Sequence, residues 1–131
     1  MLEPAKKIAL KRIKATLTRE SAVLDVGFGN GEFIRALLDS GYFPLGVDSS
    51  YEACFNARRQ FPGDYYSWDT VPSELSGVVR TTTCFEVIEH LENPEALLRT
   101  FPRGPVIFSI PNPDRWWTKL TGGYEPWDYP P

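Results

Sequence analysis

"VLDVGFGNGEF", residues 23–33, places three glycines at alternate positions directly behind an apolar run. Glycine has no Cβ and adopts positive φ readily, so Gly27, Gly29 and Gly31 permit a sharp turn and the close approach of a ligand to the backbone. The turn leads into a predicted helix, whose first N–H groups favour an anionic group. A ligand-free strand-to-helix turn is the alternative, but three alternating glycines exceed what such a turn needs. The stretch predicts a loop for a nucleotide-type cofactor.

The chain of 131 residues has an ordinary globular composition, which predicts one domain over residues 1–131. No apolar run approaches the roughly 18 residues of a membrane span, so a membrane partner is not expected. Cys54 and Cys84 are too few to imply a disulfide framework, and a reducing cytoplasm is the expected location.

The net charge of −3 is unevenly distributed. The first twenty residues hold six basic and two acidic side chains, so the remainder of the chain is acidic. A basic leading segment is compatible with nucleic acid or an anionic surface, but a solvated helix face is the interpretation we favour. An acidic protein surface binds the phosphates of duplex nucleic acid poorly, so a nucleic-acid partner is not expected.

Apolar strands alternate with helical stretches along the chain. An amphipathic helix is expected over residues 4–20, and Asn30, Ser49 or Ser50, and Asn93 are expected to cap the later helices. Strands are expected at 22–26, 42–48, 64–69, 77–85 and 105–111. This order predicts βαβ units, and therefore an α/β domain with a parallel sheet and helices on both faces.

Ligands of such sheets bind outside the carboxyl ends of the strands. Asp48 follows the second strand, where a carboxylate can accept both ribose hydroxyls. Asp69 follows the third strand and can accept an adenine amino group, with Trp68 packing on the ring. The third glycine of the dinucleotide fingerprint would fall at Glu32. The negative charge of this carboxylate is unfavourable beside a pyrophosphate. A cofactor without phosphate and with positive charge fits better, which indicates S-adenosylmethionine and disfavours NAD.

Four segments resemble, in family order, the motifs of class I S-adenosylmethionine-dependent methyltransferases. "VLDVGFGNGEF" resembles their motif I and "PLGVDSS" their ribose-binding motif. "FEVIEHLENPEALL" and "GPVIFSIPNP" resemble the fourth-strand exit and the fifth strand in the group that includes ubiquinone-biosynthesis O-methyltransferases. The resemblance implies a Rossmann-like, doubly wound, mostly parallel sheet. It also implies methyl transfer to an oxygen or nitrogen of a small-molecule acceptor.

The cofactor-binding residues expected from the loops and the resemblance are Asp25, Gly27, Phe28, Gly29, Gly31, Asp48, Ser49, Trp68, Asp69 and Glu86. Phe28 stands where the family has a small residue and is expected to narrow the pocket beside the methionine moiety. The family fold closes with a sixth and a seventh antiparallel strand, for which this sequence offers no candidate. We therefore expect a C-terminally truncated chain of about five strands.

Residues 111–131 are rich in tryptophan and tyrosine around a Gly-Gly pair, which suits a lid over a cofactor. Packing against the sheet edge, or an oligomer contact, is the alternative.

Glu86, Glu89 and His90 form an E-x-x-E-H pattern after the fourth strand. They could brace the loop, or His90 or Glu89 could act as the general base for an acceptor hydroxyl. A third interpretation is a Mg²⁺ or Mn²⁺ site, because small-RNA 3′-terminal 2′-O-methyltransferases use a similar pattern with a second histidine. This sequence has one histidine, so no metal ligand is predicted. A non-catalytic cofactor-binding or scaffold module and an RNA 2′-O-methyltransferase-like enzyme remain the alternative functions.

Overall fold

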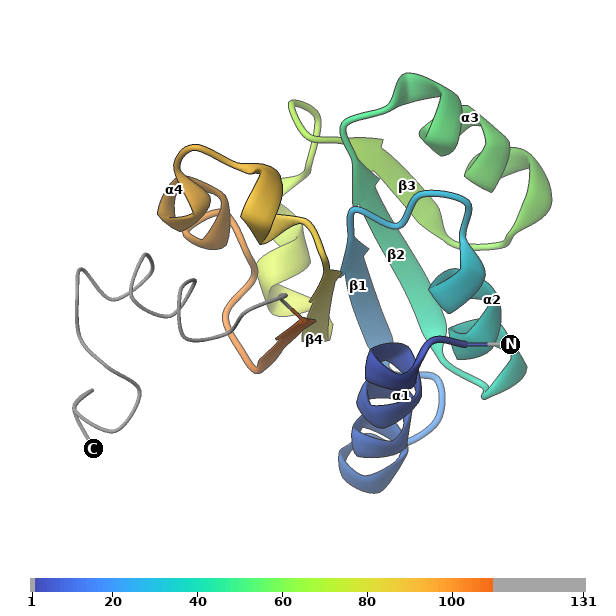
Figure 1. Ribbon diagram of the computed structural model, residues 1–131. Coiled ribbons are helices and arrows are strands. Elements are labelled where there is room, and N and C mark those ends of the chain that lie inside the picture. Colours follow the sequence, from blue (N-terminus) through green and yellow to red (C-terminus); the bar gives the residue numbers. More distant parts are fainter. Residues whose placement is uncertain (1, 110–131) are drawn as a thin grey trace, which may run out of the picture.

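The computed structural model describes residues 2–109 of the chain, except for the side chain of Glu89. Within that range the elements are α1 (Pro4–Thr16), β1 (Ala22–Val26), α2 (Glu32–Asp39), β2 (Phe43–Asp48), α3 (Tyr51–Gln60), β3 (Asp64–Ser67), η1 (Ser73–Gly77), β4 (Val79–Phe85), η2 (Ile88–His90), α4 (Pro94–Leu98) and β5 (Val106–Ser109), where η marks a 3-10 helix (Figure 1). The predicted lid over 111–131 and the exit of the fifth strand lie outside the described residues.

The described strands form one five-stranded sheet in the order β3-β2-β1-β4-β5, and every pairing is parallel. Val26, the last residue of the central strand β1, lies level with Val47 of β2 and Cys84 of β4. The strand order reverses between β1 and β4, and this is the position where open α/β sheets bind their ligands. The expected Rossmann-like fold class is confirmed.

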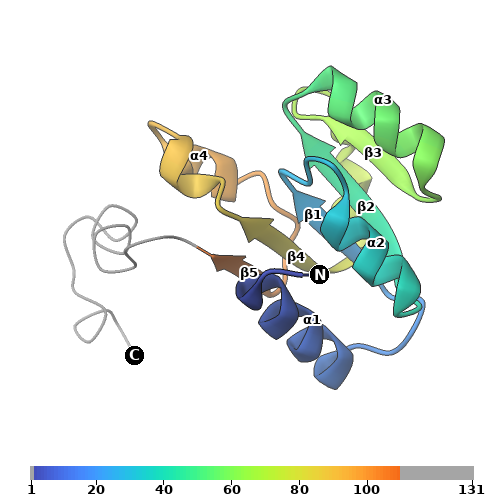
Figure 2. The same cartoon turned by 45° about the vertical axis from the view of Figure 1, so that its right-hand side comes forward.

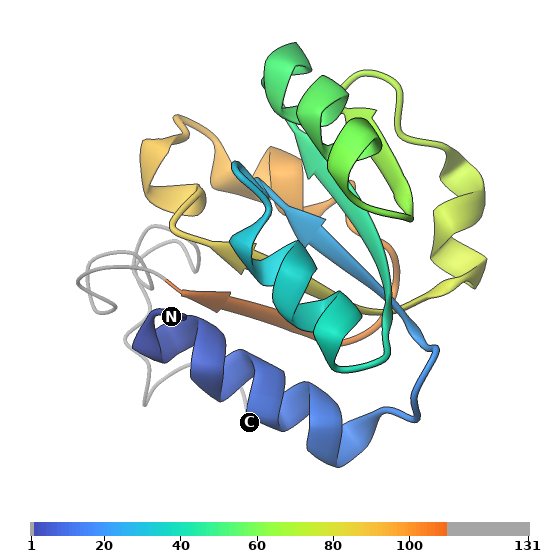
Figure 3. The same ribbon diagram turned by 90° about the vertical axis from the view of Figure 1, so that its right-hand side faces the viewer.

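Helices cover both faces of the sheet. Figure 2 shows α4 on one side of the sheet and α2 and α3 on the other, and Figure 3 shows α1 and α2 in front of the strands. On the face that α1 and α2 cover, Val23 packs with Phe33 and Ile13. On the opposite face, Leu24 and Val26 pack with residues of η1 and α4. Because β1 is covered on both faces, all five of its residues are buried, as expected for a central parallel strand.

The caps of α3 and α4 follow from their sequences. Ser50 Oγ accepts the Ala53 N–H at 3.1 Å, and Asn93 Oδ1 accepts the Ala96 N–H at 3.2 Å. Each side chain satisfies one of the N–H groups that a helix leaves unpaired in its first turn. The predicted caps at Ser50 and Asn93 are confirmed.

Several predicted boundaries differ from the structure. The first helix ends at Thr16 instead of residue 20, because Leu17 is already extended. Gly31 at φ +85°, not Asn30, is the cap of α2, although Asn30 Oδ1 still accepts the Glu32 N–H at 3.1 Å. The fourth strand, β4, begins two residues later than predicted, because residues up to Gly77 belong to η1. Among the described residues, no helix is both long and apolar enough to cross a membrane.

The two isoleucines of α1 allow a matched test of the packing between α1 and the sheet. Ile13 is fully buried, whereas Ile8 is 70 % exposed. We expect Ile13→Ala to lower the free energy of unfolding by about 2–4 kcal/mol, because it leaves a cavity against Val23 and Phe33. Ile8→Ala should change it by about 0.5 kcal/mol or less. Urea unfolding of both variants measures the difference, and equal losses would contradict this packing.

Candidate functional site

The loop after β1 turns through three glycines in the left-handed region of φ. Gly27 has φ +75°, Gly29 +57° and Gly31 +85°. L side chains rarely adopt these values, so the alternating glycines satisfy a backbone requirement at each position. The predicted sharp turn between strand and helix is present.

The three glycines differ in what lies beside them. A Cβ on Gly27 would stand 2.3 Å from Val87 Cγ2, and one on Gly31 would stand 2.5 Å from the Phe61 ring. A Cβ on Gly29 would meet no heavy atom of the described chain within 4 Å. Gly27 and Gly31 therefore also serve close packing, whereas Gly29 faces open space at the carboxyl edge of the sheet.

The Asp48 carboxylate links this loop to the end of the neighbouring strand, β2. Its Oδ2 accepts the Gly29 N–H at 2.8 Å, and its Oδ1 accepts the Ser50 N–H at 2.9 Å. The Gly27 N–H donates to the Val47 carbonyl oxygen at 2.6 Å. Asp48 is 9 % exposed, and a carboxylate has about four acceptor positions, so each oxygen can accept one further donor. Ser49, beside it, is exposed.

Asp69 lies exposed beyond the end of β3. Its Oδ1 accepts the Ser67 hydroxyl at 2.6 Å, and its Oδ2 accepts the Tyr51 hydroxyl at 3.4 Å. The hydrogen bond from Ser67 is the main reason why the pKa of this carboxyl is lowered. Asp69 is therefore held as a charged acceptor, and Tyr51 brings the start of α3 to it.

Asp25, another predicted cofactor ligand, lies inside the fold against β4. It is 2 % exposed, and its Oδ1 accepts the Thr83 hydroxyl at 2.8 Å. Burial raises the pKa of this carboxyl to about 7, while the Thr83 hydrogen bond and the charge of Lys6 oppose the shift. Thr83 was not among the predicted site residues. Its position in β4, level with Asp25 in β1, is the register that brings the two together.

Phe28, which was expected to narrow a ligand pocket, has its ring in the core between α2 and α3. Phe28 is 5 % exposed and meets the Tyr65 ring edge-on, with centroids 5.5 Å apart. A Cβ on Gly46 would stand 2.5 Å from the Phe28 ring, so this glycine makes room for it. The bulky residue in the loop anchors the loop to the core.

The segment after β4 carries the E-x-x-E-H residues. Glu86 is exposed at φ +55°, and its N–H donates to the Ser109 carbonyl oxygen at 3.1 Å. His90 is exposed at the end of η2, and its N–H donates to the Val87 carbonyl oxygen at 3.1 Å. Glu89 lies in η2 between Ile88 and His90, with its side chain outside the described structure. Val87, which sequence reasoning missed, brings this segment against Gly27.

Two buried polar atoms of the described chain have no hydrogen-bond partner within it, Glu32 Oε1 and Trp68 Nε1. Glu32 begins α2 directly behind the glycine loop. Trp68 is half-buried and packs against the apolar cluster that includes Leu24 and Val26. In residues 2–109, no group of three or more His, Cys, Asp or Glu side chains is placed to hold a metal ion.

Comparisons with known proteins agree on one family. The family described as "Methyltransferase domain" matches residues 4–130. The chain is 28 % identical to the ubiquinone biosynthesis O-methyltransferase of Idiomarina loihiensis over 102 residues, covering 69 % of this chain and 42 % of that protein. The chain therefore spans less than half the length of this curated relative.

Solved structures share the fold. The methyltransferase domain of bacterial CtHen1 is 25 % identical with a TM-score of 0.67, covering 84 % of this chain and 66 % of that one. The plantazolicin methyltransferase BpumL in complex with SAH has a TM-score of 0.58 at 18 % identity, covering 80 % of this chain and 41 % of that one. At that identity the second likeness concerns the fold alone.

The buried Asp25 carboxyl predicts a pH dependence of stability. Its pKa is about 7 in the folded chain against an ordinary 3.8, so the folded state binds the proton more tightly. The free energy of unfolding should fall as pH rises from about 4 through about 7. Asp25→Asn cannot ionise and keeps an oxygen for Thr83, so its stability relative to the natural chain should grow between pH 5 and pH 8.

Urea unfolding at the two pH values measures this difference. Thr83→Val removes the hydrogen bond that lowers the pKa of Asp25, so the loss of stability should then continue to higher pH. Parallel pH dependences of the natural chain and Asp25→Asn would show that the carboxyl does not titrate in this range.

Proposed function

Since the chain belongs to the methyltransferase-domain family, we propose that it binds S-adenosylmethionine and transfers the methyl group to an oxygen or nitrogen of a small molecule. The observation that carries the proposal is the open backbone at Gly29, held in place by the Asp48 carboxylate at the carboxyl edge of the sheet. The relative from Idiomarina loihiensis, an O-methyltransferase, supports the reaction class. The BpumL complex with SAH shows that this fold accommodates the demethylated cofactor.

The donor set at this edge suits such a cofactor. Asp48 and Asp69 lie at the ends of adjacent strands and offer carboxylate oxygens for ribose hydroxyls and for an adenine amino group. Glu32 Oε1, buried without a partner in the described chain, lies behind the glycine loop and suits a positively charged group. Its carboxylate would repel a pyrophosphate, which supports S-adenosylmethionine over NAD.

Five other predicted ligands contribute to this proposal in different ways. Gly27 and Gly31 shape the loop, and Ser49 and Glu86 are exposed on its flanks. Asp25 acts from inside the fold, where it ties β1 to β4 beneath the loop.

The sulfonium supplies an activated methyl group and a good leaving group, so alignment provides most of the catalysis. The protein residues position the two reactants and exclude water. We assign His90, or Glu89 beside it in η2, as the base that accepts a proton from the acceptor. The contact between Val87 and Gly27 links this segment to the cofactor loop, which supports the assignment. A small-molecule acceptor and a cytoplasmic location are parts of the same proposal.

Gly29 provides a direct test of cofactor binding by titration with S-adenosylhomocysteine (SAH). We expect SAH to bind the natural chain and raise its Tm, and NAD to do neither. Gly29→Ala should weaken SAH binding at least 10-fold, because its Cβ occupies the space in which the ligand approaches the backbone.

Gly77→Ala is the matched control, because a Cβ there also meets no heavy atom of the described chain within 4 Å. It should leave SAH affinity unchanged. Thermal unfolding without ligand shows whether Gly29→Ala still folds despite its φ of +57°. A folded Gly29→Ala variant with natural affinity would remove the loop from the cofactor site.

His90 is tested by turnover, followed as SAH formation with a panel of phenols and amines. With an acceptor that turns over, His90→Gln should lower kcat by roughly 10²-fold if the imidazole is the general base, with SAH affinity unchanged. Glu95→Gln, an exposed change in α4, should leave kcat unchanged.

Two other outcomes would revise the assignment. Inhibition by EDTA that Mg²⁺ reverses would assign Glu86, Glu89 and His90 to a metal site. SAH binding without turnover on any acceptor would favour the non-catalytic module.

A further inference from the structure

An apolar cavity of about 530 Å³ lies on the sheet face that η1 and α4 cover. The strand residues Leu24, Val26 and Val47 line it, together with Leu75 from η1 and Leu97 from α4. Pockets for small molecules in proteins typically measure about 300–1,000 Å³ and are lined mostly by apolar side chains. The cavity therefore has the size and the character of a ligand site.

The cavity is separate from the cofactor loop. Its lining includes none of the three loop glycines and neither Asp48 nor Asp69. The strand residues that line it belong to the cluster opposite α1, whereas the ring of Phe28 anchors the loop on the α2–α3 side. Of the residues assigned to the cofactor, only Trp68 also lines the cavity.

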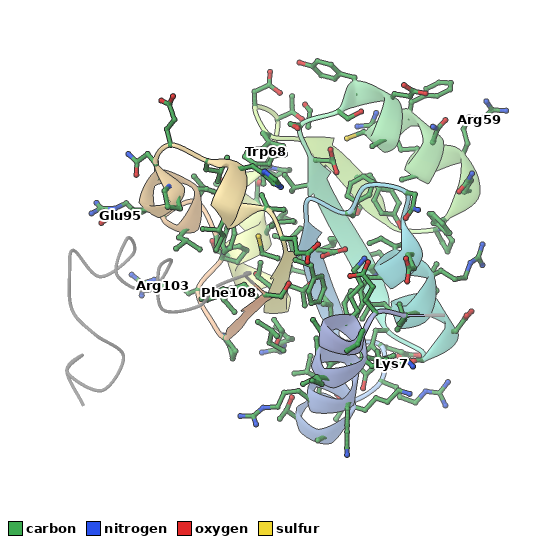
Figure 4. The ribbon with its side chains drawn as sticks, in the orientation of Figure 1. Lys7, Arg59, Trp68, Glu95, Arg103 and Phe108 are labelled. Atoms are coloured by element: carbon green, nitrogen blue, oxygen red, sulfur yellow. The ribbon has the colours of Figure 1, made fainter. Side chains whose placement is uncertain are left out.

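Trp68, which directly follows β3, is also among the residues that line the cavity. Figure 4 shows Trp68 between the side of the molecule that carries α4 and the end of β3. Its Nε1 is buried, and no atom of the described chain accepts its hydrogen bond. Because that atom has almost no accessible surface, the cavity offers its ligand apolar contacts and no hydrogen bond from Trp68.

The charges around the cavity restrict the ligand further. Within the described chain its lining includes one charged side chain, Glu92, and no lysine or arginine. A phosphate or carboxylate would lose its hydration there without a cation to replace it. An uncharged molecule loses much less hydration free energy when it enters the cavity.

We propose that this cavity is a second binding site, for an uncharged, mainly aromatic or aliphatic small molecule. The site is distinct from the cofactor site and does not require methyl transfer.

Fluorescence titration with prodan, an uncharged naphthalene ketone, tests the proposal. Prodan should bind one site per chain with blue-shifted emission, because it enters an apolar environment.

Two tryptophan substitutions on α4 locate the binding site. Ala96 lines the cavity, so Ala96→Trp should abolish prodan binding by filling it. Glu95 precedes it in the same helix and does not line the cavity, so Glu95→Trp should bind prodan as the natural chain does. Thermal unfolding confirms that both variants are folded.

Competition with SAH separates this site from the proposed function. Saturating SAH should leave the prodan affinity unchanged, and prodan binding should persist even if SAH does not bind at all. Displacement of prodan by SAH would make the cavity part of the cofactor site and overturn the proposal. The proposal would also be overturned if prodan did not bind, or if Ala96→Trp and Glu95→Trp bound prodan with equal affinity.

Discussion

The Asp48 carboxylate holds together the edge of the sheet on which the site depends. One oxygen accepts the N–H of Gly29 in the loop after β1, and the other accepts the N–H of Ser50 at the start of α3. Both loops lie at the carboxyl edge of the sheet, so one side chain sets the position of two backbone segments that follow different strands. Charge-assisted bonds of this kind are stronger than neutral ones, which suits a carboxylate that is nearly buried. The open face of Gly29 has a defined position because of this contact.

Close packing beneath the loop supports the same arrangement at a cost in stability. Gly27 and Gly31 sit against Val87 and Phe61 so tightly that neither position has room for a Cβ. Asp25 is buried against Thr83, where its pKa is about 7, so at neutral pH part of the population carries a charge in the core. A charge in the core costs stability, which is consistent with a site whose polar groups serve more than stability.

The two faces of the sheet are covered unequally. On one face, α1, α2 and α3 pack in two apolar clusters against the strands. On the other, the connection between β3 and β4 contains only the short η1, and α4 has five residues. Short elements cover less of a sheet than long helices do, and the cavity over Leu24, Val26 and Val47 lies on this face. The arrangement that builds the fold thus also creates a second concave surface beside the cofactor edge.

The order of strands and helices, the parallel sheet and the glycine loop were all determined by the sequence, because periodicity and local backbone demands are properties of neighbouring residues. The alternation of apolar strands with amphipathic helices predicted the βαβ units, and Ser50 and Asn93 marked helix starts through their own side chains. Only the tertiary structure decided which loop groups face outward. Phe28 and Asp25 lie in the same stretch as Gly29, yet both turn inward, toward Tyr65 and Thr83, which are distant in sequence. Contacts between distant residues depend on strand register and crossover path, and no local pattern in residues 23–33 encodes them.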